Sequence, residues 1–117
     1  MTTFERASQV IDQDQAAVVL FTRGPHFTYD SAGNGSTGKW VVNLDRLEKV
    51  DKVIIYLRDE KPTVNRIYLG NYIGTMPSDD PHRQVILFAC LEEVGTTEVN
   101  WLDFAGSGQN PVSYVAR

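Results

Sequence analysis

The glycine-rich stretch GNGSTGKW, residues 33–40, comes nearest to a known chemistry, the binding of a nucleotide phosphate. Its Gly and Lys spacing matches a P-loop, but Trp40 stands where that loop needs a magnesium-binding Ser or Thr. A P-loop also enters a helix directly, whereas the strand-like WVVN, which begins at Trp40, follows Lys39. These departures argue against nucleotide hydrolysis, and we expect the stretch to deliver Trp40 to a pocket.

Other residue types that perform catalysis or bind metals lack a productive spacing. His26 and His82 are far apart in the sequence, and the segment 78–82, SDDPH, is typical of a solvated turn. Glu92 and Glu93 are adjacent on a predicted strand, so their carboxylates point to opposite faces. We therefore expect no metal and no cofactor. A small hydrolase or transferase, the third class considered, lacks a convincing nucleophile.

The tryptophans are the more informative residues. Trp40 and Trp101 each stand at the end of a predicted element beside polar residues such as Lys39 and Asn100. An indole has a large apolar ring and one N–H that needs a partner when buried, which suits the wall of a cavity. The tyrosines of the middle strands, by contrast, are expected to belong to the core.

Composition places the chain among ordinary globular proteins. It has 117 residues, 42% of them hydrophobic and 22% charged, which predicts a single domain over 1–117. The net charge of −4 and the pI near 5.0 argue against indiscriminate nucleic-acid binding, but they allow a local basic rim. Cys90 lies in the apolar run VILFACL and is expected to be buried. We find no secretory signal and no apolar run of membrane-spanning length, so we expect a cytoplasmic protein without membrane contact.

Hydrophobic periodicity predicts more strands than helices. We expect short helices over residues 4–11 and 43–50, with Asn43 or Asp45 as the cap of the second, and one helical turn in the carboxy-terminal tail. Residues 23–39 are expected to form a long functional or mobile loop. The predicted strands are 16–22, 52–58, 66–74, 83–94 and 111–116.

These elements predict an α+β fold that is mainly β. Because the connections between successive strands are short, we expect a mostly antiparallel, strongly bent sheet or barrel with one or two short helices. Gly70 and Gly74 lie within one predicted strand, where glycine is typical of a bulge or tight bend that curls a sheet.

In this layout the chain resembles the PUA-like superfamily, in particular the EVE and YTH domains. The matching pieces are VVLFT, GKWVVN, LDRLEKV, DKVIIYLR, IYLGNYIG, RQVILFACLEEV and NPVSYV, which cover most of the chain from residue 16 onward. The family's Gly-Asp before the central strand is here Val50-Asp51, and its arginine before the pocket asparagine is here Val42. The resemblance implies a PUA-like barrel with Trp40 and Asn43 in a ligand pocket, and with Phe21 and Thr22 beside them.

The function that follows from this resemblance is non-catalytic recognition of a modified or flipped base in DNA or RNA. Trp40 would stack on the base, Asn43 would read its edge, and Trp101 is a further candidate for the pocket wall. The cations expected to hold flanking phosphates are Lys39, Arg23, Arg58 and Arg66. The alternative is a small acidic protein-interaction module, such as a phage or defence-system accessory protein, that contacts a basic partner. The first reading requires Trp40 to line a hollow rather than fill the core.

Overall fold

A computed structural model of the chain describes residues 2–58, 64–106 and 108–117. It is mainly β with two short α-helices among the described residues, which confirms the predicted fold class. The strands are β1 (Thr2–Thr3), β2 (Ala16–Thr22), β3 (Phe27–Tyr29), β4 (Gly35–Trp40), β5 (Lys52–Leu57), β6 (Asn65–Pro77), β7 (Gln84–Thr97) and β8 (Val112–Ala116). The helices are α1 (Leu44–Leu47), α2 (Trp101–Ala105) and the 3₁₀ turn η1 (Ala7–Gln9). None of these described helices has the length and apolar character needed to cross a membrane.

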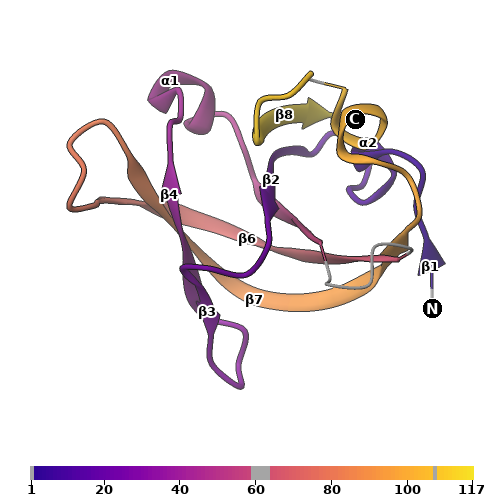
Figure 1. Cartoon of the computed structure of the whole chain (residues 1–117), viewed down its shortest axis with the longest axis horizontal. Coiled ribbons are helices and arrows are strands. Elements are labelled where there is room, and N and C mark those ends of the chain that lie inside the picture. The colour runs from indigo at the N-terminus through magenta and orange to yellow at the C-terminus, as the bar shows by residue number, and fades with distance from the viewer. Residues whose placement is uncertain (1, 59–63, 107) are drawn as a thin grey trace.

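The strands form one open, curled sheet. Its order is β3-β4-β7-β6-β5-β2-β8, with β1 added beside β7. Figure 1 shows the long strands β6 and β7 sweeping across the lower part of the molecule, with α1 and β8 above them. Because the pairing of the described strands ends at β3 and at β8, the structure is a strongly bent sheet rather than a closed barrel.

Irregular pairing between β6 and β7 accompanies the curl. The register shifts at three places, one of them across Gly70 and one immediately before Gly74. A side chain at Gly70 would bring a Cβ within 3.0 Å of the Leu91 side chain and 3.2 Å of the Ala89 carbonyl oxygen. Glycine therefore allows the two strands to approach closely at the bend, and the predicted irregularity at these glycines is confirmed.

The central strand pair departs from the expected antiparallel arrangement. β2 and β5 are parallel, with Phe21 opposite Tyr56 and Thr22 opposite Leu57. The segment 23–51, which contains β3, β4 and α1, is long enough to carry the chain back to the starting edge of the sheet. As a result, the carboxyl ends of β2 and β5 meet at one edge.

Both faces of β2 and β5 are buried, which explains their nearly continuous apolar sequences. On one face, Val18 and Ile55 belong to a first core cluster that also contains Trp40 and Leu47. On the other face, Val19, Ile54 and Tyr56 belong to a second core cluster. The second cluster also includes buried residues of η1 and α2, so these two short elements cover that face of the sheet.

Three local predictions were wrong. Residues 4–11 form only the turn η1, and the two residues before them, Thr2 and Thr3, add a short strand parallel to β7. The segment 23–39 is not a structureless loop, because it forms the antiparallel hairpin β3–β4. Cys90 is exposed and has a positive φ of 56°, so it is not a core residue.

Candidate functional site

A hollow of about 670 Å³ opens where β2 and β5 end. It lies between these strand ends, the start of α2 and the turn that precedes β8. Pockets that hold small ligands commonly have volumes of about 300–1,000 Å³, so this hollow is of suitable size. Its lining combines aromatic, cationic, amide and aliphatic side chains, namely Phe21, Trp101, Arg23, Arg58, Gln109 and Pro111, together with Asn100 and Leu102.

Phe21 and Trp101 line this Phe21–Trp101 hollow and pack with the buried Tyr56 in a cluster of three aromatic rings. The ring of Phe21 stacks on Tyr56 with centroids 5.6 Å apart and an interplanar angle of 27°. Trp101 meets Phe21 edge-on at 5.7 Å and Tyr56 at 5.5 Å. Such offset and edge-to-face contacts are the favoured arrangements of aromatic rings, so the cluster is a firm apolar platform.

The two arginines reach the hollow because β2 and β5 are parallel. Each strand delivers its next residue, Arg23 or Arg58, to the same edge of the sheet. The backbone N–H of Arg58 donates to the Thr22 carbonyl at 3.0 Å, and this bond fixes the ends of β2 and β5 side by side. The Arg23 guanidinium lies 5.8 Å from the Phe21 ring centroid, within the range of a cation–π contact. The site can therefore stack a planar group and attract an anion.

Helix α2 holds Trp101 in place. Asn100 caps the helix, accepting a hydrogen bond at Oδ1 from the backbone N–H of Asp103 at 3.0 Å. The indole Nε1–H of Trp101 donates to the Asn110 carbonyl at 2.9 Å. With its one donor satisfied and 9% of the residue exposed, Trp101 offers an apolar edge rather than a polar group to a ligand.

Tyr56 supports the platform in its neutral form. Burial raises the pKa of Tyr56 above its ordinary value, and the nearby charge of Arg58 offsets only part of that effect. The Tyr56 hydroxyl donates to the Val99 carbonyl at 2.7 Å. This bond ties β5 to the segment that leads into α2.

Trp40 does not lie at this hollow. The residue is 7% exposed and belongs to the first core cluster, and it lines none of the four main hollows over the described residues. It is the last residue of β4, opposite Gln84 of β7, because the segment before it forms a strand instead of a loop. A ring enclosed in the core presents no face for a base, so the requirement that Trp40 line a hollow is not met. A base would have to enter a different hollow, without Trp40.

Asn43 and Thr22 have structural roles. Asn43 caps α1, and its Oδ1 accepts a hydrogen bond from the Arg46 backbone N–H at 3.2 Å, as the sequence predicts for the cap. Thr22 is buried, and its Oγ1 accepts a hydrogen bond from the backbone N–H of Gly24 at 3.0 Å. Neither side chain lines the Phe21–Trp101 hollow.

The two remaining cations predicted from the sequence lie elsewhere. Lys39 lines a separate hollow beside β4 and forms an ion pair with Asp79 at 2.5 Å. The hydrogen bond and the charge of Lys39 lower the pKa of the Asp79 carboxyl. Arg66 lies opposite Leu57 of β5, and Leu57 belongs to the first core cluster. Directly opposed residues share one face of a sheet, so Arg66 lies on that face, away from Tyr56. Of the four predicted phosphate contacts, the structure brings together only Arg23 and Arg58.

Four lining residues were not predicted as site residues from the sequence, namely Asn100, Leu102, Gln109 and Pro111. Nothing in the sequence indicated a role for Gln109, yet its exposed side chain lies at the hollow. Leu102 is 47% exposed because the buried face of α2 carries Trp101, Phe104 and Ala105. An apolar residue outside the buried stripe of a helix is a signal that could have been read from the spacing.

Comparison with protein-family models, curated proteins and solved structures finds no match to this chain. The resemblance to PUA-like domains therefore stays a prediction, and the functional argument depends on the geometry of the hollow.

Proposed function

We propose that the chain is a non-catalytic binding module that accepts a flipped or modified base of DNA or RNA in the Phe21–Trp101 hollow. One observation carries the proposal. Four of the residues predicted as ligand or phosphate contacts, two aromatic and two cationic, line this single hollow: Phe21, Trp101, Arg23 and Arg58. Parallel pairing of β2 with β5 is what gathers three of them.

Stacking would supply the affinity for the base. The Phe21 ring stacks on Tyr56 and also contacts the Arg23 guanidinium. Arg23 lines the open hollow, where a base can reach it. Bases that leave a nucleic-acid stack are received on aromatic rings or on guanidinium planes. Each such contact contributes about 1–3 kcal/mol, which is enough for a weak to moderate binder with one base bound.

The amide of Gln109 supplies the polar contact that a base edge requires. It carries one acceptor and two donors, so it can pair with either side of a base. The second amide at the hollow, Asn100, already bonds Asp103 through both its oxygen and its nitrogen. Gln109 is therefore the residue we assign to reading the base.

Arg23 and Arg58 would contact the flanking phosphates. Because the chain carries a net charge of −4, long-range attraction to nucleic acid is absent and binding depends on this local pair. For single strands, the logarithm of affinity falls with the logarithm of salt by about 0.7 per phosphate neutralised. Two contacts therefore predict a slope of about −1.4.

The test is fluorescence anisotropy with labelled single-stranded DNA and RNA octamers that carry either unmodified or methylated bases. We expect the protein to bind at least one of the octamers, with a slope of log affinity against log salt of about −1.4. The R23Q/R58Q variant should bind about tenfold more weakly. The matched control is R46Q/K49Q, which removes the same charge elsewhere and should bind nearly as the parent does. Equal losses in both variants, or no binding at any salt, would refute the proposal, and absence of binding would favour the acidic protein-interaction alternative.

A further inference from the structure

Strand β8 is a free edge of the sheet. Among the described strands it is the last in the pairing order, and it pairs only with β2. At the ends of this pairing, Arg117 N–H donates to the Gln15 carbonyl at 2.9 Å and Phe21 N–H donates to the Pro111 carbonyl at 2.9 Å. In an antiparallel pair, backbone groups of alternate residues point toward the partner and away from it. The odd-numbered residues of β8 therefore bond β2.

The outward backbone groups of β8 belong to the even-numbered residues. Val112 N–H is satisfied by the Asn110 side chain at 3.0 Å. Within residues 2–58, 64–106 and 108–117, no hydrogen bond reaches the backbone N–H or C=O of Tyr114 and Ala116 on that side. These groups form the template onto which another strand can add. The opposite edge, β3, has only three residues and offers a shorter template.

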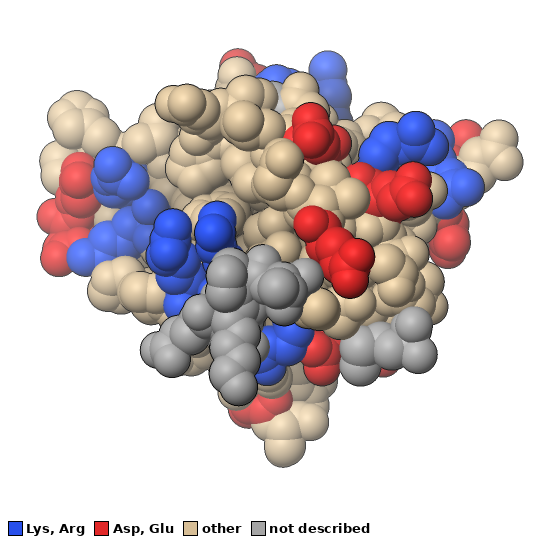
Figure 2. All heavy atoms as spheres, turned by 45° about the vertical axis from the view of Figure 1, so that its right-hand side comes forward, with Lys and Arg blue, Asp and Glu red and all other residues tan. Residues whose placement is uncertain are grey.

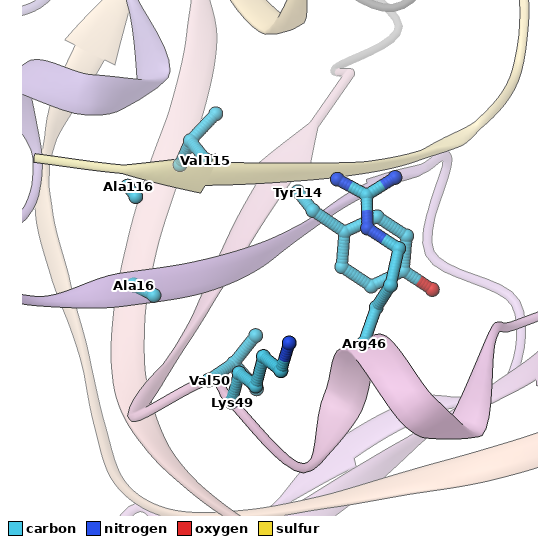
Figure 3. A pocket seen from close by; sticks show the side chains of 7 residues that line it. All are labelled: Ala16, Arg46, Lys49, Val50, Tyr114, Val115 and Ala116. Atoms are coloured by element: carbon cyan, nitrogen blue, oxygen red, sulfur yellow. The ribbon is translucent and has the colours of Figure 1, made fainter.

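A small cationic hollow adjoins this edge. It has a volume of about 240 Å³ and lies between α1 and strands β2 and β8. Figure 3 shows Arg46 on α1 and Lys49 just beyond the end of this helix, with Tyr114 and Ala116 of β8 across the hollow from them. The edge therefore has two positive charges beside it, although the chain as a whole is acidic.

The Arg46 side chain is held in position. Its guanidinium lies 4.1 Å from the centroid of the Tyr114 ring, a close cation–π contact. The Tyr114 hydroxyl accepts a hydrogen bond from the Asn43 backbone N–H at 2.9 Å, which fixes the ring against α1. A guanidinium placed in this way loses less conformational freedom when it binds a carboxylate.

We propose that the β8 edge docks an extended peptide segment with acidic side chains, which adds to the sheet as a further strand. The outward N–H and C=O groups of Tyr114 and Ala116 would pair with the peptide backbone. Carboxylates on alternate peptide residues lie on one face of a strand and would meet Arg46 and Lys49. This site is separate from the Phe21–Trp101 hollow and does not depend on the function proposed there.

Charge favours such a partner over a second copy of the chain. Antiparallel pairing of two β8 strands would bring Arg46 and Lys49 of both copies to one seam, where like charges repel. The acidic residue Asp51 accepts a hydrogen bond from Ala16 N–H at 3.1 Å and does not line the hollow. Arg46 and Lys49 can therefore pair with an acidic strand from another protein.

The test uses a fluorescein-labelled ten-residue peptide of alternating Thr and Glu with the full-length protein. We expect saturable binding, loss of about tenfold in affinity for R46Q/K49Q, and little change for R23Q/R58Q. A peptide with Gln in place of Glu should bind as weakly as the double variant binds the acidic peptide. No binding of the acidic peptide, or equal binding of the Gln peptide, would overturn the proposal.

Backbone pairing is tested separately. Ala116→Pro removes an outward N–H without removing a bond to β2, so binding should be lost while the melting temperature changes little. Should this variant fail to fold, the unaltered protein with a peptide N-methylated on alternate residues gives the same information. Binding that tolerates N-methylation on both alternate sets, or a β8-dependent dimer in sedimentation velocity, would contradict the proposal.

Discussion

At the residue scale, the two tryptophans show what a sequence can and cannot predict about a site. Trp40 is the last residue of β4 and Trp101 the first of α2, each beside polar residues, yet Trp40 fills the first core cluster and Trp101 lines the hollow. The difference arises from pairing with β7, which encloses the end of β4. Such enclosure depends on residues distant in the sequence, so local context alone does not predict it.

The role of Trp40 can be tested through stability. Because the ring is buried among aliphatic and aromatic neighbours, Trp40→Ala should lower the free energy of unfolding by about 3–5 kcal/mol. Urea denaturation measures this change. The adjacent Val41, which is 60% exposed, is the control, and Val41→Ala should change the free energy by less than about 0.5 kcal/mol. A Trp40→Ala protein of nearly unchanged stability would show that the ring is not a core residue.

The raised pKa of Tyr68 leads us to expect a loss of stability at alkaline pH. Burial raises the pKa of Tyr68 from its ordinary value of 10.0 to about 12, against a smaller lowering by Arg66. The folded state thus binds this proton more tightly than the unfolded state. Its contribution to stability is complete below pH 10 and is lost as pH rises toward 12.

The measurement is the free energy of unfolding between pH 9 and 12 for the parent and for Tyr68→Phe, in steps of about half a pH unit. The variant should show a shallower decline over this range, because it lacks one of the tyrosines whose pKa is raised. Parallel curves for the two proteins would mean that Tyr68 ionises equally in both states.

At the element scale, the strands were predictable because each has its own apolar and β-branched composition. β2, β5 and β8 occur within the predicted regions, whereas β6 and β7 overlap theirs and extend beyond them to Pro77 and Thr97. The partners of the strands were less predictable. A short polar hairpin such as β3–β4 has weak periodicity, and the parallel pair β2–β5 requires contacts across the whole of 23–51. Because this pair brings Arg23 to Arg58, the site could not be assembled from the sequence alone.

The cap of α1 gives a prediction at this scale. Asn43→Ala removes the side-chain oxygen that accepts the Arg46 backbone N–H, so it should lower the free energy of unfolding by about 1 kcal/mol. Asn43→Asp keeps the acceptor and is the control. Since Asn43 lies away from the Phe21–Trp101 hollow, oligonucleotide affinity in the anisotropy assay should not change. If Asn43→Ala lowered oligonucleotide affinity without changing stability, Asn43 would have to be a ligand contact rather than only a helix cap.

At the scale of the whole molecule, charge is distributed unevenly. Figure 2 shows one face on which the largest group of Lys and Arg side chains lies left of the centre, with several acidic side chains right of it. The overall charge of −4 therefore does not describe every part of the surface. Local binding of anions at one or two places is compatible with an acidic protein, whereas tracking along nucleic acid is not.

Entry of a base into the Phe21–Trp101 hollow can be followed through the two indole N–H signals in a ¹⁵N–¹H correlation spectrum of one sample. The bound octamer is added stepwise, and both signals are followed after assignment. We expect a progressive shift of the Trp101 signal, because its ring lines the hollow, and a nearly stationary Trp40 signal, because its ring lies in the core. A shift confined to Trp40, or no shift of Trp101 at saturation, would contradict binding of a base in this hollow.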